Sequence, residues 1–309
     1  MTVGVTLTLE EVLRLGAVTG KLTLPKRQTA RSNFSGNYLS KFRGRGMEFD
    51  EIRPYQAGDD IRTIDWRVTA RMTETYTKLF REERERPIFI FIDQNATMKF
   101  GTRTAFKSII AARIASMLAW AATSAGDRVG AVIFDDERHS EVRPTPGKRG
   151  VINIAKTLID YSNKLQYSQR ADIPAWHSAL NRAKYIVHPG SHLIFISDFR
   201  QPNEIIEKQL ALLKRHNDIS LIYVYDALEK HPPPAGRYTV SNGTKFHSLL
   251  FGKSTEKSLQ LEHVEKAECF LESMSKKHGM HTLQIATDTV LEDTLLQAFH
   301  SSARRGRHG

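Results

Sequence analysis

Short runs of consecutive apolar residues alternate along this chain with segments whose apolar residues recur every three or four positions. The runs are typical of strands buried on both faces, and the other segments are typical of helices with one apolar face. The predicted strands are Ile88–Ile92, Asp127–Phe134, Leu193–Ser197, Ile219–Tyr225 and His281–Ala286. The predicted helices are Arg103–Thr123, Val151–Leu165, Ala175–Tyr185, Glu204–Arg215, Ser254–Lys277 and Asp288–Phe299. This alternation predicts a mostly parallel sheet with helices on both faces.

Weaker local signals complete the predicted set of elements. Thr75–Phe80 alternates apolar and polar residues as a strand does, and Arg237–Phe251 is predicted to form a hairpin. Asp288 is a candidate N-cap for the last helix. Residues 20–46 are rich in Ser, Asn, Gly and Arg, which predicts a loop.

The chain of 309 residues is long enough for one large domain and one smaller one. We predict an N-terminal basic arm and patterned block over residues 1–86, an α/β domain over 87–300, and a basic disordered tail over 301–309. The smaller N-terminal segment, of β and irregular structure, is expected to pack on the α/β domain.

Polar side chains follow two of the apolar runs at the points where they end. Asp93, Asn95 and Thr97 leave the first strand at every second position, and Asp198 follows a later strand. Ligands of parallel sheets bind at the carboxyl ends of the strands, and carboxylate, amide and hydroxyl oxygens suit Mg²⁺, Mn²⁺ or Ca²⁺. The alternative is that these side chains only cap the following helix and turns.

These residues carry a resemblance to known families. Asp93-Gln94-Asn95-Ala96-Thr97 resembles the metal-ion-dependent adhesion site (MIDAS) motif of von Willebrand factor A domains, with Asn95 and Thr97 in place of serines, and Asp198 resembles that family's later metal-site aspartate. The block before it is more specific: Gly46-Met-Glu-Phe-Asp-Glu-Ile-Arg-Pro-Tyr55, Gly58-Asp-Asp-Ile-Arg-Thr-Ile-Asp-Trp66 and Thr69-Ala-Arg71. This block is similar to the signature of the bacterial DUF58 family. The resemblance covers roughly Arg43 to Phe199.

The resemblance implies a von Willebrand factor A-like fold and a partner. Members of the DUF58 family are typically encoded beside MoxR-type AAA+ ATPases and act with them, and with other von Willebrand A proteins, in the assembly or maturation of complexes. It also implies a divalent cation such as Mg²⁺ on Asp93, Asn95, Thr97 and Asp198. The family's further threonine ligand has no match here: either Asp172 substitutes for it, or this ligand is missing.

A second group of residues combines charges of both signs with two aromatic rings. Its members are Arg53, Tyr55, Asp59, Asp60, Arg62, Asp65, Trp66, Arg67 and Arg71. Charge-assisted hydrogen bonds and stacking of arginine on aromatic rings are expected among them. We interpret the group as a network joining the N-terminal segment to the α/β domain, with Trp66 buried, or else as a partner-binding surface.

The net charge of +11 is concentrated in two segments. Residues 20–46 hold seven basic residues and no acid, and residues 301–309 add three arginines. Such arms could contact an anionic membrane, nucleic acid or an acidic protein, or could simply be solvated. Because the patterned block mixes both signs, no specific nucleic-acid binding is expected.

The same features bear on the location of the chain. The longest apolar stretch, Ile109–Ala122, contains Arg113 and is shorter than the about 18 residues of a membrane-spanning helix. The N-terminus also lacks the pattern of a signal peptide. We therefore expect a cytoplasmic protein, with peripheral contact at the inner membrane as an alternative.

The rival enzymatic hypothesis also starts from Asp93. Haloacid-dehalogenase-type phosphatases use such a strand-end aspartate as nucleophile and a second acid two positions later. Here that second position is Asn95, which cannot transfer the proton. No P-loop and no His-Glu-x-x-His motif occurs either. The sequence therefore favours a non-enzymatic protein-interaction module.

Overall fold

The computed structural model describes residues 4–22, 24, 47–56, 58–59, 61–72, 74–82, 87–163, 174–231, 233–234, 236–241, 246–251 and 254–305. The chain divides into two compact units, which we describe separately. One unit comprises Met1–Gln28 with Arg86–Gly309, and the other comprises Thr29–Glu85.

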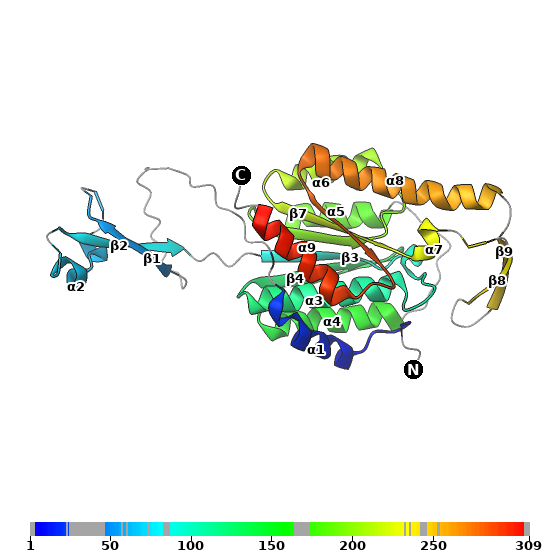
Figure 1. The fold of residues 1–309 in the computed structure, drawn as a ribbon, viewed down its shortest axis with the longest axis horizontal. Coiled ribbons are helices and arrows are strands. Elements are labelled where there is room, and N and C mark those ends of the chain that lie inside the picture. Colours follow the sequence, from blue (N-terminus) through cyan, green and yellow to red (C-terminus); the bar gives the residue numbers. More distant parts are fainter. Residues whose placement is uncertain are drawn as a thin grey trace. The chain divides into compact units, whose positions relative to one another are not determined.

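The larger unit is built on a six-stranded sheet (Figure 1). Its strands are β3 (Pro87–Asp93), β4 (Arg128–Phe134), β5 (His139–Pro146), β6 (His192–Ser197), β7 (Asp218–Tyr225) and β10 (His281–Ala286). Their order is β10-β7-β6-β3-β4-β5, and every neighbouring pair is parallel except β4 with β5. The predicted mostly parallel sheet is confirmed.

The edge strand β5 was not predicted from the sequence. It lacks an apolar run, carries Pro144 and Pro146, and is half-buried or exposed along its length. An edge strand has one side without a neighbour, so it tolerates proline and does not need two apolar faces. The apolar pattern therefore detects only the inner strands.

Helices cover both faces of the sheet, as predicted. One face carries α1 (Leu9–Val18), α3 (Lys107–Ser124), α4 (Lys148–Asn163) and α9 (Leu291–Arg305). The other face carries α5 (Pro174–Ile186), α6 (Glu204–Lys214) and α8 (Ser254–His278). The short helix α7 (Ala227–Lys230) follows β7 directly.

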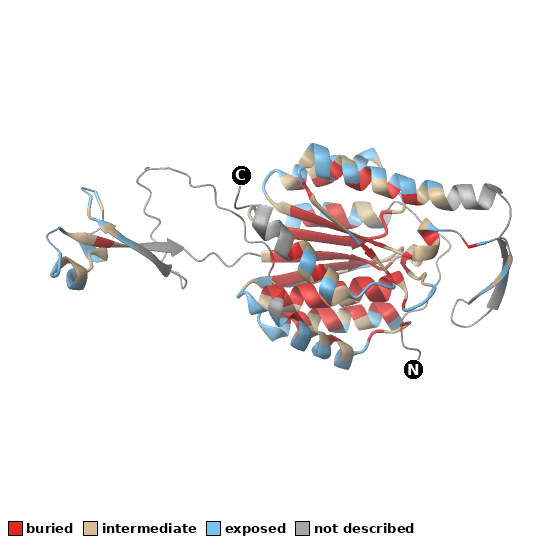
Figure 2. Ribbon diagram, viewed as in Figure 1, coloured by how far each residue is buried: buried red, intermediate tan, exposed pale blue. Residues whose placement is uncertain are grey.

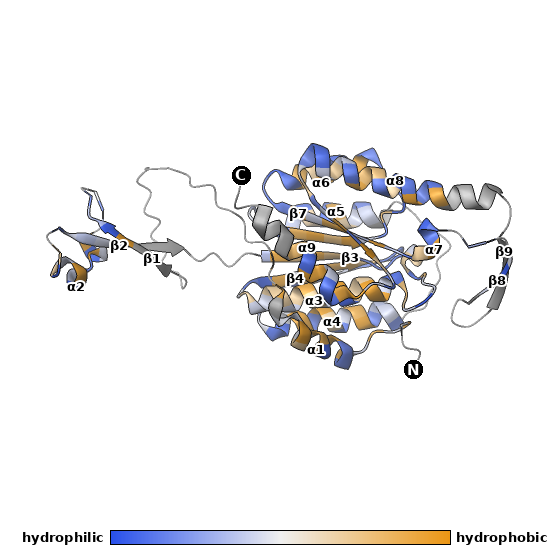
Figure 3. Cartoon of the chain, in the orientation of Figure 1, coloured by the Kyte–Doolittle hydropathy of each residue, from blue (hydrophilic) through white to orange (hydrophobic). Residues whose placement is uncertain are grey.

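Alternate residues of β3 pack into two separate hydrophobic cores, one on each face of the sheet. Ile88, Ile90 and Ile92 pack with α3 and α4, whereas Phe89 and Phe91 pack with α5, α6 and α8. Buried residues therefore run along the central strands and the inner sides of the helices (Figure 2), and apolar residues follow the same path (Figure 3). Because both faces are covered, the strand is a continuous apolar run rather than an alternating one.

Helix α1 packs on α3, which changes the predicted domain boundary. Arg113 Nε of α3 donates to Glu11, and Trp120 Nε1 donates to the Val12 carbonyl 2.9 Å away. Val12 is buried in the same core as α3. The first 28 residues thus belong to the α/β unit rather than to the N-terminal block. Helix α3 is accordingly buried on nearly all sides, not amphipathic as its spacing predicted.

We expect a chain that starts at Arg86 to be markedly less stable than the full chain. It loses the buried Leu7, Val12, Leu22 and Leu24, and each large buried apolar side chain contributes about 1.5–3 kcal/mol. Urea unfolding of the two chains measures the difference. The expectation is wrong if a chain starting at Arg86 unfolds at the same urea concentration as the full chain.

The smaller unit is a hairpin with two short helices. Strand β1 (Met47–Pro54) pairs antiparallel with β2 (Tyr76–Glu82), which confirms the strand predicted at Thr75–Phe80. The short helices η2 (Ile61–Thr63) and α2 (Trp66–Thr69) lie between these strands in sequence.

The charged network predicted for this unit forms only in part. Arg53 pairs with Asp59 at 2.7 Å, and the Tyr55 hydroxyl donates to the Asp59 carbonyl. Asp65 caps α2 and pairs with Lys78 at 3.2 Å. Arg62, Arg67 and Arg71 are exposed, and Asp60 lies outside the described residues.

Within its own unit the Trp66 side chain is 66% exposed, at the start of α2, where Asp65 caps the helix. Its predicted role in joining the N-terminal segment to the α/β domain concerns a contact between the two units and stays a prediction.

Toward the C-terminus the structure contains the predicted hairpin, but the last helix differs from its prediction at both ends. Strands β8 (Gly236–Ser241) and β9 (Phe246–Phe251) form the predicted hairpin. Helix α9 starts at Leu291, so Asp288 does not cap it and instead pairs with Arg103. Because α9 continues to Arg305, residues 301–305 are helical rather than a disordered tail, and residues 306–309 lie outside the described part. Most of the predicted basic arm at 20–46 also lies outside it.

Among the described helices, none combines the length and the hydropathy that crossing a membrane requires.

Candidate functional site

The four residues predicted to form a metal site meet at one edge of the sheet. Asp93 ends β3 and Asp198 follows β6, and these neighbouring parallel strands are in register at Ile92 and Ile196. Asn95 and Thr97 lie in the segment after β3, which contains the short helix η3 (Ala96–Met98). The Thr97 side chain hydrogen-bonds to the Asp198 carboxylate. The tertiary structure therefore brings Asp93, Thr97 and Asp198 close together, and the backbone amide of Asn95 joins them at Asp93.

Asp93 is fully buried among uncharged donors. Its Oδ2 accepts from Ser197 Oγ at 2.6 Å and from Trp176 Nε1 at 3.3 Å, and its Oδ1 accepts from the Asn95 amide at 2.9 Å. Burial, together with the nearby charge of Asp198, raises the pKa of Asp93 to about 7. Without a cation, this carboxyl group is partly protonated at neutral pH.

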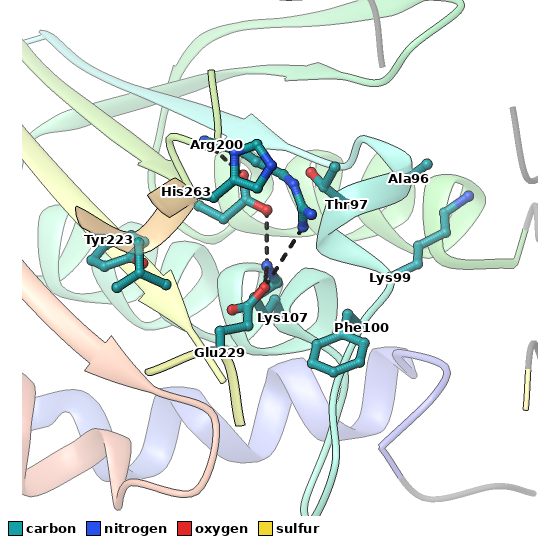
Figure 4. Close-up of a pocket in the computed structure, with 11 residues that line it drawn as sticks. Ala96, Thr97, Lys99, Phe100, Lys107, Arg200, Tyr223, Glu229 and His263 are labelled. Carbon is teal, nitrogen blue, oxygen red and sulfur yellow. Dashed lines mark hydrogen bonds and ion pairs between the residues drawn. The ribbon is translucent and has the colours of Figure 1, made fainter. Parts of the chain in front are cut away.

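Asp198 is ionised because a lysine lies beside it. Lys107 Nζ is 2.8 Å from Asp198 Oδ2 and 2.7 Å from Glu229 Oε1. Burial opposes ionisation of Asp198, but the Lys107 ammonium outweighs it and holds the pKa of Asp198 below its usual range. Burial also disfavours the ammonium, but Asp198 and Glu229 together raise the pKa of Lys107. The three groups form a buried ion triad, and Figure 4 shows two of its members, Lys107 and Glu229.

Glu229 is held in place by the N-terminus of α7. Asp226 caps α7, and Glu229 Oε2 accepts from the Asp226 amide at 2.9 Å, which completes a capping box. Asp226 is itself anchored by the hydroxyls of Thr102 and Thr287 at 2.7 and 2.6 Å. The triad thus rests on contacts from several loops at the same edge of the sheet.

The backbone after Asp198 is strained. Phe199 has φ of 42°, in the left-handed region that non-glycine residues rarely adopt. Its amide donates to Ser197 Oγ at 3.0 Å, and its ring packs against Trp176 and Phe270. Such strain persists where surrounding contacts enforce it, and here the Ser197 hydroxyl and two aromatic rings supply those contacts.

A cavity of about 610 Å³ adjoins these residues. Its lining includes Thr97 and Asp198 from the predicted site and two residues of the triad, Lys107 and Glu229. Arg200 and His263 lie on its wall, as Figure 4 shows. The other lining residues are Ala96, Lys99, Phe100, Tyr223 and Val264. The cavity therefore offers cationic and aromatic groups next to the buried carboxylates.

The donor set fits a divalent cation. Asn95 Oδ1 is buried and has no hydrogen-bond partner among the described residues, which is unusual for a buried oxygen. It lies in the same loop as Asp93 and Thr97, whose oxygens are of the type that Mg²⁺ and Mn²⁺ prefer. Within the described residues no cluster of three His, Cys, Asp or Glu side chains is suited to a metal, so Asn95 and Thr97 would have to contribute. Asp172 lies outside the described residues.

Sequence reasoning missed the partners of the predicted site. Ser197 and Trp176 hold Asp93, and Lys107 and Glu229 hold Asp198. One available signal was the sequence Asp226-Ala-Leu-Glu229, a capping-box pattern directly after a predicted strand. Lys107 carried no signal of its own, because nothing local distinguishes it from a surface lysine at the start of a helix.

Topology and site together define a von Willebrand factor A-like α/β protein. A parallel sheet with one antiparallel edge strand is covered by helices on both faces, and the Asp-x-Asn-x-Thr loop leaves the strand β3. The chain belongs to the family described as "Protein of unknown function DUF58", whose model matches residues 51–268. The family predicted from the sequence is thereby confirmed.

The chain is similar to several other proteins. It is 27% identical to the uncharacterized protein Mb1516 of Mycobacterium bovis over 223 residues, which cover 72% of this chain and 69% of that protein. Among solved structures, the conserved hypothetical protein BatB from Bacteroides thetaiotaomicron has 14% identity and a TM-score of 0.44, with 71% of this chain and 99% of that one covered. The SpRpn10 VWA domain has 10% identity and a TM-score of 0.38, with 69% and 95% covered.

Proposed function

We propose that this chain is a non-enzymatic protein-interaction module whose site at the end of the sheet binds a divalent cation and, through it, an acidic group of a partner. The observation that carries the proposal is the buried Asn95 Oδ1, which has no hydrogen-bond partner among the described residues. It belongs to the residue whose backbone amide donates to Asp93, and the charge of Asp198 acts on Asp93. A cation would supply the missing partner and reduce the repulsion between the carboxylates.

The residues that would hold the cation are Asp93, Asn95, Thr97 and Asp198. The cation, when bound, would offer a coordination position to an outside carboxylate. Arg200 on the cavity wall would assist, because a cationic side chain favours an acidic group. The family resemblance supports a MoxR-type AAA+ ATPase as the partner, which would supply the energy for the assembly or maturation of a client complex.

The non-enzymatic part of the proposal is supported by the surroundings of Asp93. Its neighbours are the Ser197 hydroxyl, the Trp176 indole and the Asn95 amide. A phosphatase of the haloacid-dehalogenase type would need a general acid at Asn95, and an amide cannot transfer a proton.

Mn²⁺ is expected to raise the melting temperature of the full chain. A ligand at about 100 times its Kd stabilises the folded state by about 2.7 kcal/mol, which corresponds to roughly 5–10 °C for a unit of this size. Asp93→Ala is expected to abolish the rise, because it removes a buried cation ligand. Differential scanning fluorimetry with millimolar Mn²⁺, and then with a chelator, measures both effects.

Two further measurements bear on the proposal as a whole. The MoxR-type ATPase should be captured by wild type in Mn²⁺ and lost on chelation, whereas Asp93→Ala should capture it in neither condition. Hydrolysis of an aryl phosphate by wild type, lost in Asp93→Asn, would contradict the non-enzymatic assignment. If Mn²⁺ changes the melting temperature equally in wild type and Asp93→Ala, the proposed cation site is wrong.

A further inference from the structure

The candidate site contains a cation of its own. Lys107 Nζ lies 2.8 Å from Asp198 Oδ2, on a carboxylate that the proposed function assigns to a divalent ion. The lysine side chain is 1% exposed, so water does not screen its charge. Among the described residues around the site, Lys107 is the basic group that reaches both Asp198 and Glu229 by hydrogen bonds.

The ammonium cannot easily leave this position. Lys107 is the first residue of α3 and is buried on the sheet. Glu229 Oε1 holds the ammonium from the other side at 2.7 Å, and Glu229 is itself fixed by the capping box of α7. A long lysine at a surface could swing away from an arriving cation, but this one is pinned between two carboxylates.

We infer that Lys107 is a built-in cation that holds Asp198 in the metal-free protein and weakens the binding of a divalent ion at the same site. The inference rests on the proposed function, because it concerns the affinity of the site proposed there. Two cations that share one buried carboxylate repel each other strongly, since the protein interior screens charge much less than water does.

The ion triad thereby gives the site two properties. The metal-free site is preorganised, because the ammonium balances the charge of a buried carboxylate whose other contacts are hydrogen bonds from the Thr97 side chain and the Arg200 amide. Divalent-ion binding is weakened, because the ion must share Asp198 with an ammonium that stays in place. Lys107 and Glu229 together determine the affinity of the site for the divalent ion.

The test compares Mn²⁺ affinity in full-length variants by isothermal titration calorimetry. The informative variant is Lys107→Met with Glu229→Gln, which removes the ammonium and also neutralises the carboxylate that it leaves behind. The glutamine keeps an oxygen for the Asp226 amide. The matched control is Lys208→Met, which removes one positive charge from an exposed pair on α6. We expect Kd for Mn²⁺ to fall at least ten-fold in the double variant and to stay unchanged in the control.

Each outcome decides one of the two proposals. Equal Mn²⁺ affinity in wild type and the double variant would overturn the role of Lys107 and leave the cation site standing. No Mn²⁺ binding by any form would overturn the cation site and the inference with it. If the double variant is unfolded without metal, circular dichroism during Mn²⁺ titration replaces calorimetry: folding on addition of Mn²⁺ supports the inference, and failure to fold while wild type binds Mn²⁺ overturns it.

Discussion

Lys107→Met alone is expected to lower the free energy of unfolding by about 3–5 kcal/mol, a large share of the stability of a typical domain. The substitution removes the ammonium that lies between Asp198 and Glu229, and leaves Arg200, 4.0 Å from Glu229, as the nearby cation. Methionine fills a similar volume and favours helix, so the loss arises from the missing charge beside two buried carboxylates rather than from a cavity or from helix propensity. Urea unfolding of wild type and variant at pH 7 measures it.

The matched control for this effect is Lys208→Met. Lys208 pairs with Glu204 at 3.3 Å within α6, but the two side chains are 74% and 86% exposed. A pair in water contributes less than about 1 kcal/mol, so this variant should unfold almost as wild type does. A second check is Glu229→Gln in the Lys107→Met background, which should recover part of the loss because one unpaired carboxylate is neutralised. If Lys107→Met and Lys208→Met unfold alike, the triad does not stabilise the fold as argued.

The pH dependence of stability is the second large expected effect, and it is assigned to Asp93. The folded-state pKa of Asp93 is about 7, above the ordinary value of 3.8 that applies to the unfolded chain. Between these two values the folded protein binds the proton more tightly than the unfolded chain does. The protein therefore loses stability as the pH rises from about 4 to about 7, and the loss stays complete above pH 7.

Asp93→Asn should remove this dependence, because asparagine cannot ionise. One pKa unit corresponds to about 1.36 kcal/mol. The free energy of unfolding of the variant, taken relative to that of wild type, should therefore increase by about 3 kcal/mol from pH 5 to pH 8. The measurement is urea unfolding at both pH values with a chelator present. Mn²⁺ should reduce the gain, since a cation at the site would favour the ionised carboxylate of wild type.

Glu204→Gln is the control for the pH experiment. Glu204 is an exposed acid, so its substitution should change the free energy of unfolding by less than about 1 kcal/mol at either pH. A difference between Asp93→Asn and wild type that is the same at pH 5 and pH 8 would show that Asp93 is ionised in both folded and unfolded states. The burial argument for its raised pKa would then be wrong.

The sequence by itself determined the sheet and the place of the site. A strand covered on both faces must be apolar throughout, so the runs at Ile88–Ile92 and Leu193–Ser197 were visible without any knowledge of their neighbours. Parallel strands end at the same edge, so polar residues directly after two such runs had to lie near each other. For this reason Asp93 and Asp198 could be paired from the sequence.

Only the tertiary structure decided what surrounds these carboxylates and which surfaces are covered. Lys107 and Glu229 are 122 positions apart, and no local pattern distinguishes a lysine that will be buried from one that will be solvated. Helix α1 was assigned to the wrong unit because its partner surface on α3 lies about a hundred residues later. The exposure of Trp66 within its own unit, 66%, was likewise not visible in the sequence, because the charged residues around it look the same whether the ring is covered or not. The local pattern of apolar and polar residues indicates whether a segment is buried. The partner of a single charge or ring depends instead on contacts between segments that are distant in sequence.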